Sequence, residues 1–215
     1  MQQVTKVWDL AVRFFHWSQL LLIGGLWYTG EQGLMAQHQL LAYTLLALVI
    51  ARLIWGFAGS QNARFAEFAA TPAQAWRYLR QPVPIAGHNP ASFYMILLLI
   101  LLVIVQLVSG LATFDNSYLS DGPLVASLPQ AWVDLASEVH SINIDILLGA
   151  IALHIVAAIW HSIRVHNVIK LMFTGKESAQ SEGKAFKHSG WFFLLFTVLL
   201  IVFYSWQGAS LMALG

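Results

Sequence analysis

The sequence predicts an all-α integral membrane protein that forms a single membrane domain over residues 1–215. Its 215 residues are 58% hydrophobic and only 10% charged, whereas about a quarter of the residues are charged in soluble globular domains. Five apolar stretches are each long enough to cross about 30 Å of hydrocarbon as a helix. They lie at approximately 10–29, 39–58, 92–114, 142–163 and 190–208. The first four would form a four-helix transmembrane bundle, and the fifth would be an additional C-terminal transmembrane helix.

The first stretch has the length of a secretory signal peptide, but its sequence favours a retained helix. Asp9, Arg13 and His16 stand at its entrance, and no convincing small-residue cleavage site follows it. A signal peptide would combine a continuous apolar region with such a site. We therefore expect 10–29 to remain in the protein as the first span.

The segment between the second and third spans predicts a short helix over about 72–80. Thr71 and Pro72 are typical of an N-cap and a first turn, and Trp76, Arg77, Tyr78 and Arg80 follow. This mixture of aromatic and basic residues is typical of a helix that lies on a membrane surface. An ordinary solvated loop is the alternative. Further along, Pro90 predicts the start of the third span.

The remaining connections are polar. Residues 115–139 form a long acidic loop in which Pro129 to Glu138 predicts a separate short helix. Residues 175–189, before the fifth stretch, are polar and predict a mobile loop.

The charges are strongly segregated along the chain. All eleven basic residues lie in or beside one set of span ends, and the opposite ends and loops (30–38, 115–141 and 209–215) contain none. The positive-inside rule then places the N-terminus and the loops 59–91 and 164–189 in the cytoplasm, and the C-terminus outside. The basic residues are Lys6, Arg13, Arg52, Arg64, Arg77, Arg80, Arg164, Lys170, Lys176, Lys184 and Lys187.

Four histidines fall within or at the ends of the predicted spans at matching depths. His140 and His154 are 14 residues apart, which on one helix corresponds to about 21 Å of rise and nearly four whole turns. His16 lies near the inner end of the first span, and His38 near the outer end of the second. The sequence therefore predicts that His16 faces His154 near the inner surface and that His38 faces His140 near the outer surface.

Two facing histidines at each of two depths suit two stacked b-type haems. A lone histidine in a membrane helix is more often a hydrogen-bonding group, but paired ones indicate function. A zinc ion would require four ligands at one point. The absence of cysteine excludes disulfides, iron–sulfur clusters and covalent haem attachment. A haem with two axial histidines has no free site for oxygen, which indicates electron transfer.

Further residues are candidates for supporting roles. Arg52 could pair with a haem propionate or extend to the inner lipid headgroups. His161 is the rival of His154 as a ligand, or it could contact a propionate or a quinone, and His88 could also contact a propionate. Small residues that would let a macrocycle approach the helices are Gly24, Gly25 and Gly149.

These residues also carry a family resemblance, which covers about residues 7–176. The sequence resembles the bacterial cytochrome b561 / nickel–iron hydrogenase cytochrome b family. The matching motifs are Val7-Trp8-Asp9-Leu10, Arg13-Phe14-Phe15-His16-Trp17, His38, Arg52-Leu53-Ile54-Trp55-Gly56-Phe57, Gly87-His88-Asn89-Pro90, Leu153-His154 and Trp160-His161-Ser162. The resemblance implies a haem-binding core of four helices in the bacterial inner membrane. It also implies two b haems with axial ligands His16, His38, His140 and His154, and electron exchange with membrane quinones.

The leading functional hypothesis is a relay of electrons between an outer-surface redox protein and the quinone pool. The partner could be a hydrogenase or a c-type cytochrome, and the acidic outer loop would suit a basic docking face. This describes an electron-transfer subunit of an oxidoreductase better than a stand-alone enzyme. The aromatic and basic surface of Trp76, Arg77, Tyr78 and Arg80 suggests an inner quinone site. Lipid surrounds the bundle, no nucleic acid is expected, and 190–208 could dock a partner or a second copy in a homodimer.

Two alternatives belong to other functional classes. A self-contained superoxide:quinone oxidoreductase would need a cationic outer funnel to attract an anion, and the outer loops contain no basic residue. A haem-free transporter could use its histidines to relay protons, but the paired depths count against it.

Overall fold

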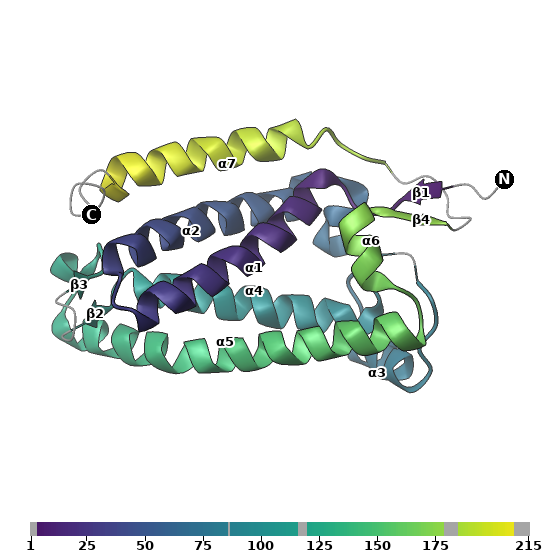
Figure 1. Cartoon of the computed structure of the whole chain (residues 1–215), viewed down its shortest axis with the longest axis horizontal. Coiled ribbons are helices and arrows are strands. Elements are labelled where there is room, and N and C mark those ends of the chain that lie inside the picture. Colours follow the sequence, from purple (N-terminus) through teal and green to yellow (C-terminus); the bar gives the residue numbers. More distant parts are fainter. Residues whose placement is uncertain (1–3, 86, 116–119, 179–184, 209–215) are drawn as a thin grey trace.

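The computed structural model describes residues 4–85, 87–115, 120–178 and 185–208. Four long helices form a bundle (Figure 1): α1 (Leu10–Glu31), α2 (Met35–Ala58), α4 (Pro90–Gly110) and α5 (Gln130–Arg164). A fifth helix, α7 (Gly190–Phe203), runs beside α2. The shorter helices are α3 (Pro72–Arg80) and α6 (Val168–Thr174). Strand β1 (Val4–Lys6) pairs with β4 (Lys176–Ser178), and β2 (Phe114–Asp115) pairs with β3 (Ser120–Asp121). The apolar pattern does not predict these short strands.

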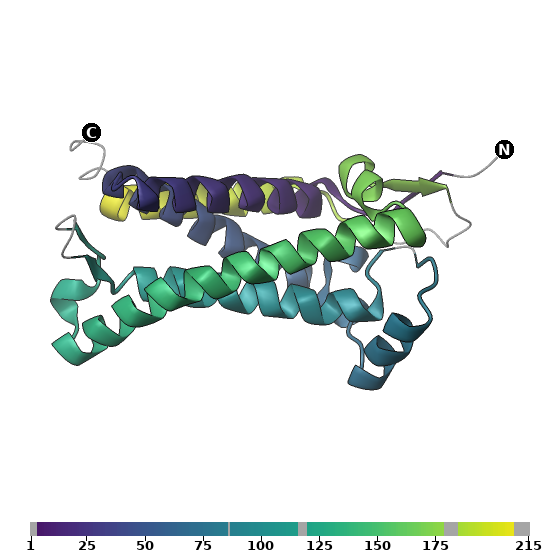
Figure 2. The ribbon, with the colours of Figure 1, turned by 60° about the horizontal axis from the view of Figure 1, so that its bottom comes forward.

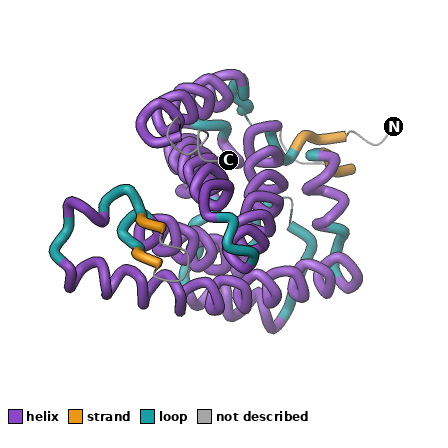
Figure 3. The backbone as a smooth tube through the Cα atoms, turned by 60° about the vertical axis from the view of Figure 1, so that its left-hand side comes forward, coloured by secondary structure: helices purple, strands orange, loops and turns teal. Residues whose placement is uncertain are grey.

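The long helices are arranged in two layers. One layer contains α1, α2 and α7, with α2 packed against both of the others, and the second contains α4 packed on α5 (Figure 2). Contacts within each layer are extensive, whereas helices of different layers make few close contacts. The tube in Figure 3 shows the same arrangement obliquely from one end of the bundle. The side chains of the candidate site described below lie in the space between these two layers.

Four helical segments are long and apolar enough to cross a membrane among the described residues. They are Met35–Ala58, Pro90–Gly110, Gln130–Arg164 and Gly190–Gln207. The predicted first span, α1, is also long enough, but Arg13, His16 and Gln19 make its first half more polar. The chain is therefore a membrane protein with four clear candidate spans, and the crossing of α1 stays a prediction.

Two helix boundaries differ from the sequence-based expectation. The predicted separate helix from Pro129 to Glu138 is wrong, because α5 runs without a break from Gln130 to Arg164. Its N-terminal part therefore continues about three turns from His140 back to Gln130. The third span is shorter than predicted, since α4 ends at Gly110 and the chain then turns into β2.

The predicted start signals of α3 and α4 are confirmed. Thr71 and Gln74 form a reciprocal capping box at the start of α3, with Pro72 in its first turn. Asn89 caps α4 by accepting a hydrogen bond of 2.8 Å from the backbone N–H of Ser92. Each cap satisfies a backbone donor that the first helical turn leaves without a partner.

Aromatic side chains fix α7 to the first layer. Phe192 is fully buried and contacts the rings of Phe14 and Trp55. At the far end of α7, the hydroxyls of Tyr204 and Thr44 form a hydrogen bond of 2.9 Å. One face of α7 is thus part of the molecule's own packing.

The two ends of the bundle differ in charge. Figure 1 shows α3, α6 and the β1–β4 pair at one end, and the β2–β3 pair at the other. The first end carries Arg77, Arg80 and Lys170, and the second carries Asp121 and Asp134. The predicted mobile loop 175–189 is wrong at residues 176–178, which form β4 and pair with β1. Residues 179–184 of that loop and the predicted outer C-terminus at 209–215 lie outside the described residues.

Candidate functional site

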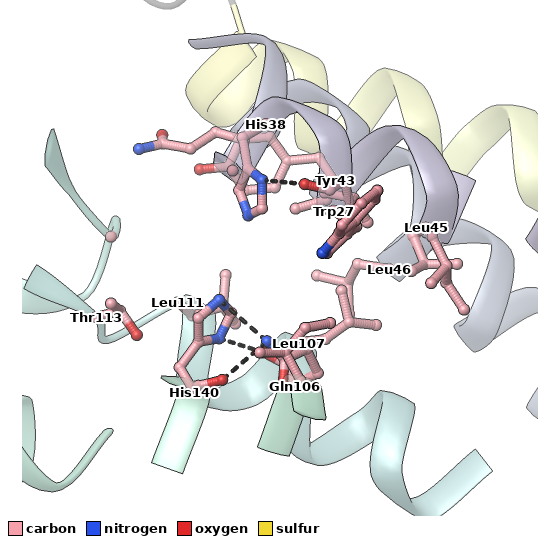
Figure 4. Close-up of a pocket in the computed structure, with 18 of the residues that line it drawn as sticks. Trp27, His38, Tyr43, Leu45, Leu46, Gln106, Leu107, Leu111, Thr113 and His140 are labelled. Atoms are coloured by element: carbon pink, nitrogen blue, oxygen red, sulfur yellow. Dashed lines mark hydrogen bonds between the residues drawn. The ribbon is translucent and has the colours of Figure 1, made fainter. Parts of the chain in front are cut away.

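His38 on α2 and His140 on α5 face each other across the two layers. Their ring centroids are 6.4 Å apart, and Figure 4 shows the two rings on opposite sides of a pocket. The pocket has a volume of about 260 Å³ and a largely apolar lining that includes Leu26, Trp27 and Leu107. These residues come from α1, α2, α4 and α5, so all four bundle helices contribute to this level.

Hydrogen bonds to backbone carbonyls fix the tautomer of both rings. The Nδ1–H of His38 donates to the carbonyl oxygen of Leu26 at 2.9 Å, and that of His140 donates to the carbonyl oxygen of Gln106 at 3.0 Å. A neutral imidazole that carries its proton on Nδ1 presents the lone pair of Nε2. A carbonyl that receives the other N–H is the usual support of a metal-bound histidine.

The side chain of Gln106 also contacts Nε2 of His140, the ring nitrogen that does not bond to a backbone carbonyl. Its Nε2 lies 3.2 Å from Nε2 of His140, and its Oε1 accepts a hydrogen bond of 2.7 Å from Nδ2 of Asn143. The amide therefore occupies the lone pair through which His140 would bind a metal. Binding there requires the side chain of Gln106 to rotate, while its backbone carbonyl can keep its contact with Nδ1.

Two glycines leave room for these rings. A Cβ atom added at Gly110 would lie 2.9 Å from Cε1 of His140, and one added at Gly30 would lie 3.5 Å from the ring of His38. The glycines expected from the sequence to leave such room are Gly24, Gly25 and Gly149 instead. Gly24 and Gly149 have no side chain or neighbouring helix within 4 Å of an added Cβ. Gly149 also lies half a turn away from the face of His140, since nine residues rotate a helix by about 900°.

His16 on α1 and His154 on α5 form the second facing pair. Their ring centroids are 6.3 Å apart, and Trp17 packs edge-on against His16. The Nδ1 atom of His16 is buried and has no hydrogen-bond partner among the described residues. The sequence-predicted residues are therefore brought together in two pairs, one toward each end of the bundle.

Arg52 lies deep in the protein near the His16 pair. Its side chain is only 4% exposed, so it does not extend to a lipid surface. The guanidinium carbon lies 4.9 Å from the ring centroid of Phe65 and 5.8 Å from that of Phe15, the neighbour of His16. Its Nη1 atom is buried without a hydrogen-bond partner among the described residues. A buried guanidinium with an unsatisfied donor is suited to bind a carboxylate.

The two other histidine candidates lie outside these pairs. His161 is buried against Tyr78 of α3, whose hydroxyl is 2.5 Å from its Nε2, and the two rings are stacked. Burial raises the pKa of Tyr78 above its usual value of 10.0, so its hydroxyl is protonated at neutral pH and can donate to that nitrogen. His88 packs against the rings of Trp8 and Phe68 near the start of α4.

The geometry of the two pairs fits a metal held by two axial imidazoles. Two metal–imidazole bonds of about 2 Å, plus the distance from each nitrogen to its ring centre, separate such rings by about 6 Å. The observed separations are 6.3 and 6.4 Å. No group of three or more metal-ligating side chains occurs within the described ranges.

Comparison with known protein families gives a match over most of the chain. The family model described as prokaryotic cytochrome b561 matches residues 7–175, which include all four paired histidines. No curated protein and no solved structure gives a significant match.

Proposed function

The chain belongs to the prokaryotic cytochrome b561 family of membrane b-type cytochromes, and on this basis we propose that it carries electrons through two b haems stacked between its helix layers. The observation that carries the proposal is the pair of matched histidine spacings, 6.3 Å at one level and 6.4 Å at the other. His16 and His154 would hold one haem, and His38 and His140 the other. Each haem would supply a one-electron redox couple.

The residues of the chain have distinct tasks in this proposal. The four imidazoles would hold the two haem irons, one pair at each level, and would leave no free position for exogenous ligands, which would restrict the chemistry to electron transfer. The carbonyl groups of Leu26 and Gln106 orient the rings of His38 and His140. Arg52 would bind a propionate of the haem held by His16 and His154, and the apolar side chains between the layers exclude water.

We propose five spans, with the N-terminus in the cytoplasm and the C-terminus on the periplasmic side of a bacterial inner membrane. The segregation of basic residues toward the end that carries α3 and α6 supports this orientation. Polar residues near the inner end of α1 would then lie close to the headgroups, where charged side chains are tolerated. The level of His16 and His154 becomes the inner one, and that of His38 and His140 the outer one.

The two surfaces suggest different partners. The outer end exposes Asp121, Asp134 and Glu138, which would dock a redox protein with a basic face, such as a hydrogenase or a c-type cytochrome. The inner end exposes Trp76, with the guanidinium of Arg80 4.9 Å from its ring centroid. We propose that quinone exchanges electrons at this end, near the hydrogen-bonded Tyr78 and His161.

A reduced-minus-oxidised absorption spectrum of the purified protein tests the proposal. We expect a b-type spectrum, a haem content of two per polypeptide, and reduction by a water-soluble quinol analogue. Absence of a b-type band in protein purified from haem-replete cells would refute the cytochrome assignment. Haem that is present but is not reduced by quinol would refute the quinone relay alone.

A further inference from the structure

The two histidine pairs differ in what supports their rings. At the outer level each Nδ1 has two oxygen neighbours, a backbone carbonyl and a hydroxyl. The hydroxyl oxygen of Thr29 is 3.3 Å from Nδ1 of His38, and that of Ser109 is 3.3 Å from Nδ1 of His140. The inner level differs, because Nδ1 of His16 is buried without a partner among the described residues.

The hydroxyls are held so that their oxygens can accept. Thr29 donates its hydroxyl proton to the carbonyl oxygen of Gly25 at 2.8 Å, and Ser109 donates to that of Val105 at 2.7 Å. Both carbonyls belong to the preceding turn of the same helix. The hydroxyl oxygens therefore point their lone pairs toward the Nδ1–H groups, and each outer imidazole shares its proton between two acceptors.

The two levels also differ in the charged side chains that lie near the histidine rings. Glu31 lines the pocket at the outer pair. Arg52 lies buried beside Phe15 at the inner pair and is close to the basic end of the bundle. A nearby anion disfavours the addition of an electron and a nearby cation favours it. Arg52 is buried and poorly screened, whereas Glu31 is exposed and its effect is reduced by solvent.

We propose that Thr29 and Ser109, together with the carbonyls of Leu26 and Gln106, hold the outer haem at a lower midpoint potential than the inner haem. The inference rests on the proposed haem ligation and extends it to the relative potentials of the two sites. An imidazole whose N–H is shared with strong acceptors becomes a more basic, more electron-donating ligand. Such a ligand stabilises the ferric state, and hydrogen bonding around axial ligands is one of the means by which proteins tune haem potential.

The ordering favours movement of electrons from the outer to the inner level. Arg52 adds positive charge at the inner level, and the buried carboxylate of Asp9, which interacts with it electrostatically, offsets part of that charge. Thr29 and Ser109 are positioning residues in this account, because they act through His38 and His140.

Potentiometric titration of the holoprotein tests the ordering directly. His16→Ala leaves the outer haem alone and His38→Ala leaves the inner haem alone, so each midpoint can be assigned to a level. We expect the haem retained in His16→Ala to titrate at the lower potential. The inference is overturned if that haem titrates at the same or a higher potential than the haem retained in His38→Ala.

A second experiment tests the two hydroxyls. The combined Thr29→Val and Ser109→Ala substitutions should raise the lower midpoint and leave the upper one unchanged, while Thr29→Ser with Ser109→Thr should restore the wild-type value. Thr44→Val, which removes a hydroxyl from α2 that bonds to Leu40 and Tyr204, should move neither midpoint. An unchanged lower midpoint in the hydroxyl-free variant, with both haems bound, would overturn the role of Thr29 and Ser109 and leave the proposed ligation intact. Failure of the wild-type protein to bind haem would instead refute the proposed function.

Discussion

The carboxylate of Asp9 joins the start of α1 to the end of α2 through the indole of Trp55. Its Oδ2 accepts a hydrogen bond of 3.0 Å from Nε1 of Trp55, and its Oδ1 accepts one of 2.8 Å from the backbone N–H of Val12. The carboxylate is 1% exposed. Asp9 is therefore both the N-cap of α1 and the partner of a buried donor on α2, two helices that each carry a haem-ligand candidate.

Replacement of Asp9 should destabilise the bundle. Asp9→Ala removes a helix cap, which costs about 1 kcal/mol, and leaves a buried indole N–H unpaired, which costs about 1–3 kcal/mol. We expect a lower midpoint of thermal unfolding in detergent, followed by circular dichroism. Asp134→Ala is the control, because Asp134 is exposed and, among the described residues, bonds to Gln130 of its own helix. Equal midpoints for the two variants would show that the Asp9–Trp55 contact contributes little.

Gly110→Ala should disturb the outer haem selectively. The added Cβ would lie 2.9 Å from the ring of His140, so the ring must move or the helices must separate. We expect loss or spectral change of one haem, measured by haem content and by electron paramagnetic resonance of the low-spin ferric state. Gly149→Ala changes the same amount of volume on an exposed face of α5 and should leave both haems unaltered. A wild-type spectrum for Gly110→Ala would mean that His140 does not keep this ring position in the holoprotein.

His154 and His161 should respond differently to substitution. His154→Ala removes one of two axial imidazoles and should lose the inner haem. His161→Ala should retain both haems, because its ring is engaged with Tyr78 and lies outside the facing pair; slower reduction by quinol is expected if the quinone binds nearby. Haem loss in His161→Ala with full retention in His154→Ala would reverse the assignment.

The orientation of the chain in the membrane can be tested with fused reporters whose activity depends on the compartment. A reporter fused after Gly215 should be active on the periplasmic side, and one inserted near Ser181 should be active in the cytoplasm. The basis is the concentration of all basic residues toward one set of span ends. A cytoplasmic C-terminal reporter would mean that the membrane is crossed an even number of times, so that either α1 or α7 does not span.

Much of the architecture follows from one-dimensional patterns. Long apolar stretches predict the helices because a membrane requires about 20 apolar residues per crossing, and caps such as Thr71 mark helix starts locally. The prediction failed at Pro129 to Glu138. The change from a polar to an apolar stretch resembles an element boundary there, although α5 continues across it. Polarity marks where a helix leaves the bilayer, and it does not mark where the helix ends.

The facing of the histidines follows from helix geometry, but their surroundings do not. His140 and His154 share a face because fourteen residues are nearly four turns. Leu26 acts through its backbone carbonyl, and any residue has one, so its identity carries no signal. Gln106 and Gly110 of α4 meet His140, and Asn143 bonds to Gln106, because α4 packs against α5 in a particular register. Gly149 does not face the paired histidines, because it lies half a turn from the face of His140 on α5.

The haem content of paired histidine variants tests the central claim most directly. If His16 and His154 share one haem and His38 and His140 share the other, the double variant His16→Ala/His154→Ala should retain one haem per polypeptide, as each single variant does. The double variant His16→Ala/His140→Ala should retain none. The measurement is the pyridine haemochromogen content of purified protein, normalised to polypeptide. Loss of both haems from the first double variant, or retention of one by the second, would contradict the pairing.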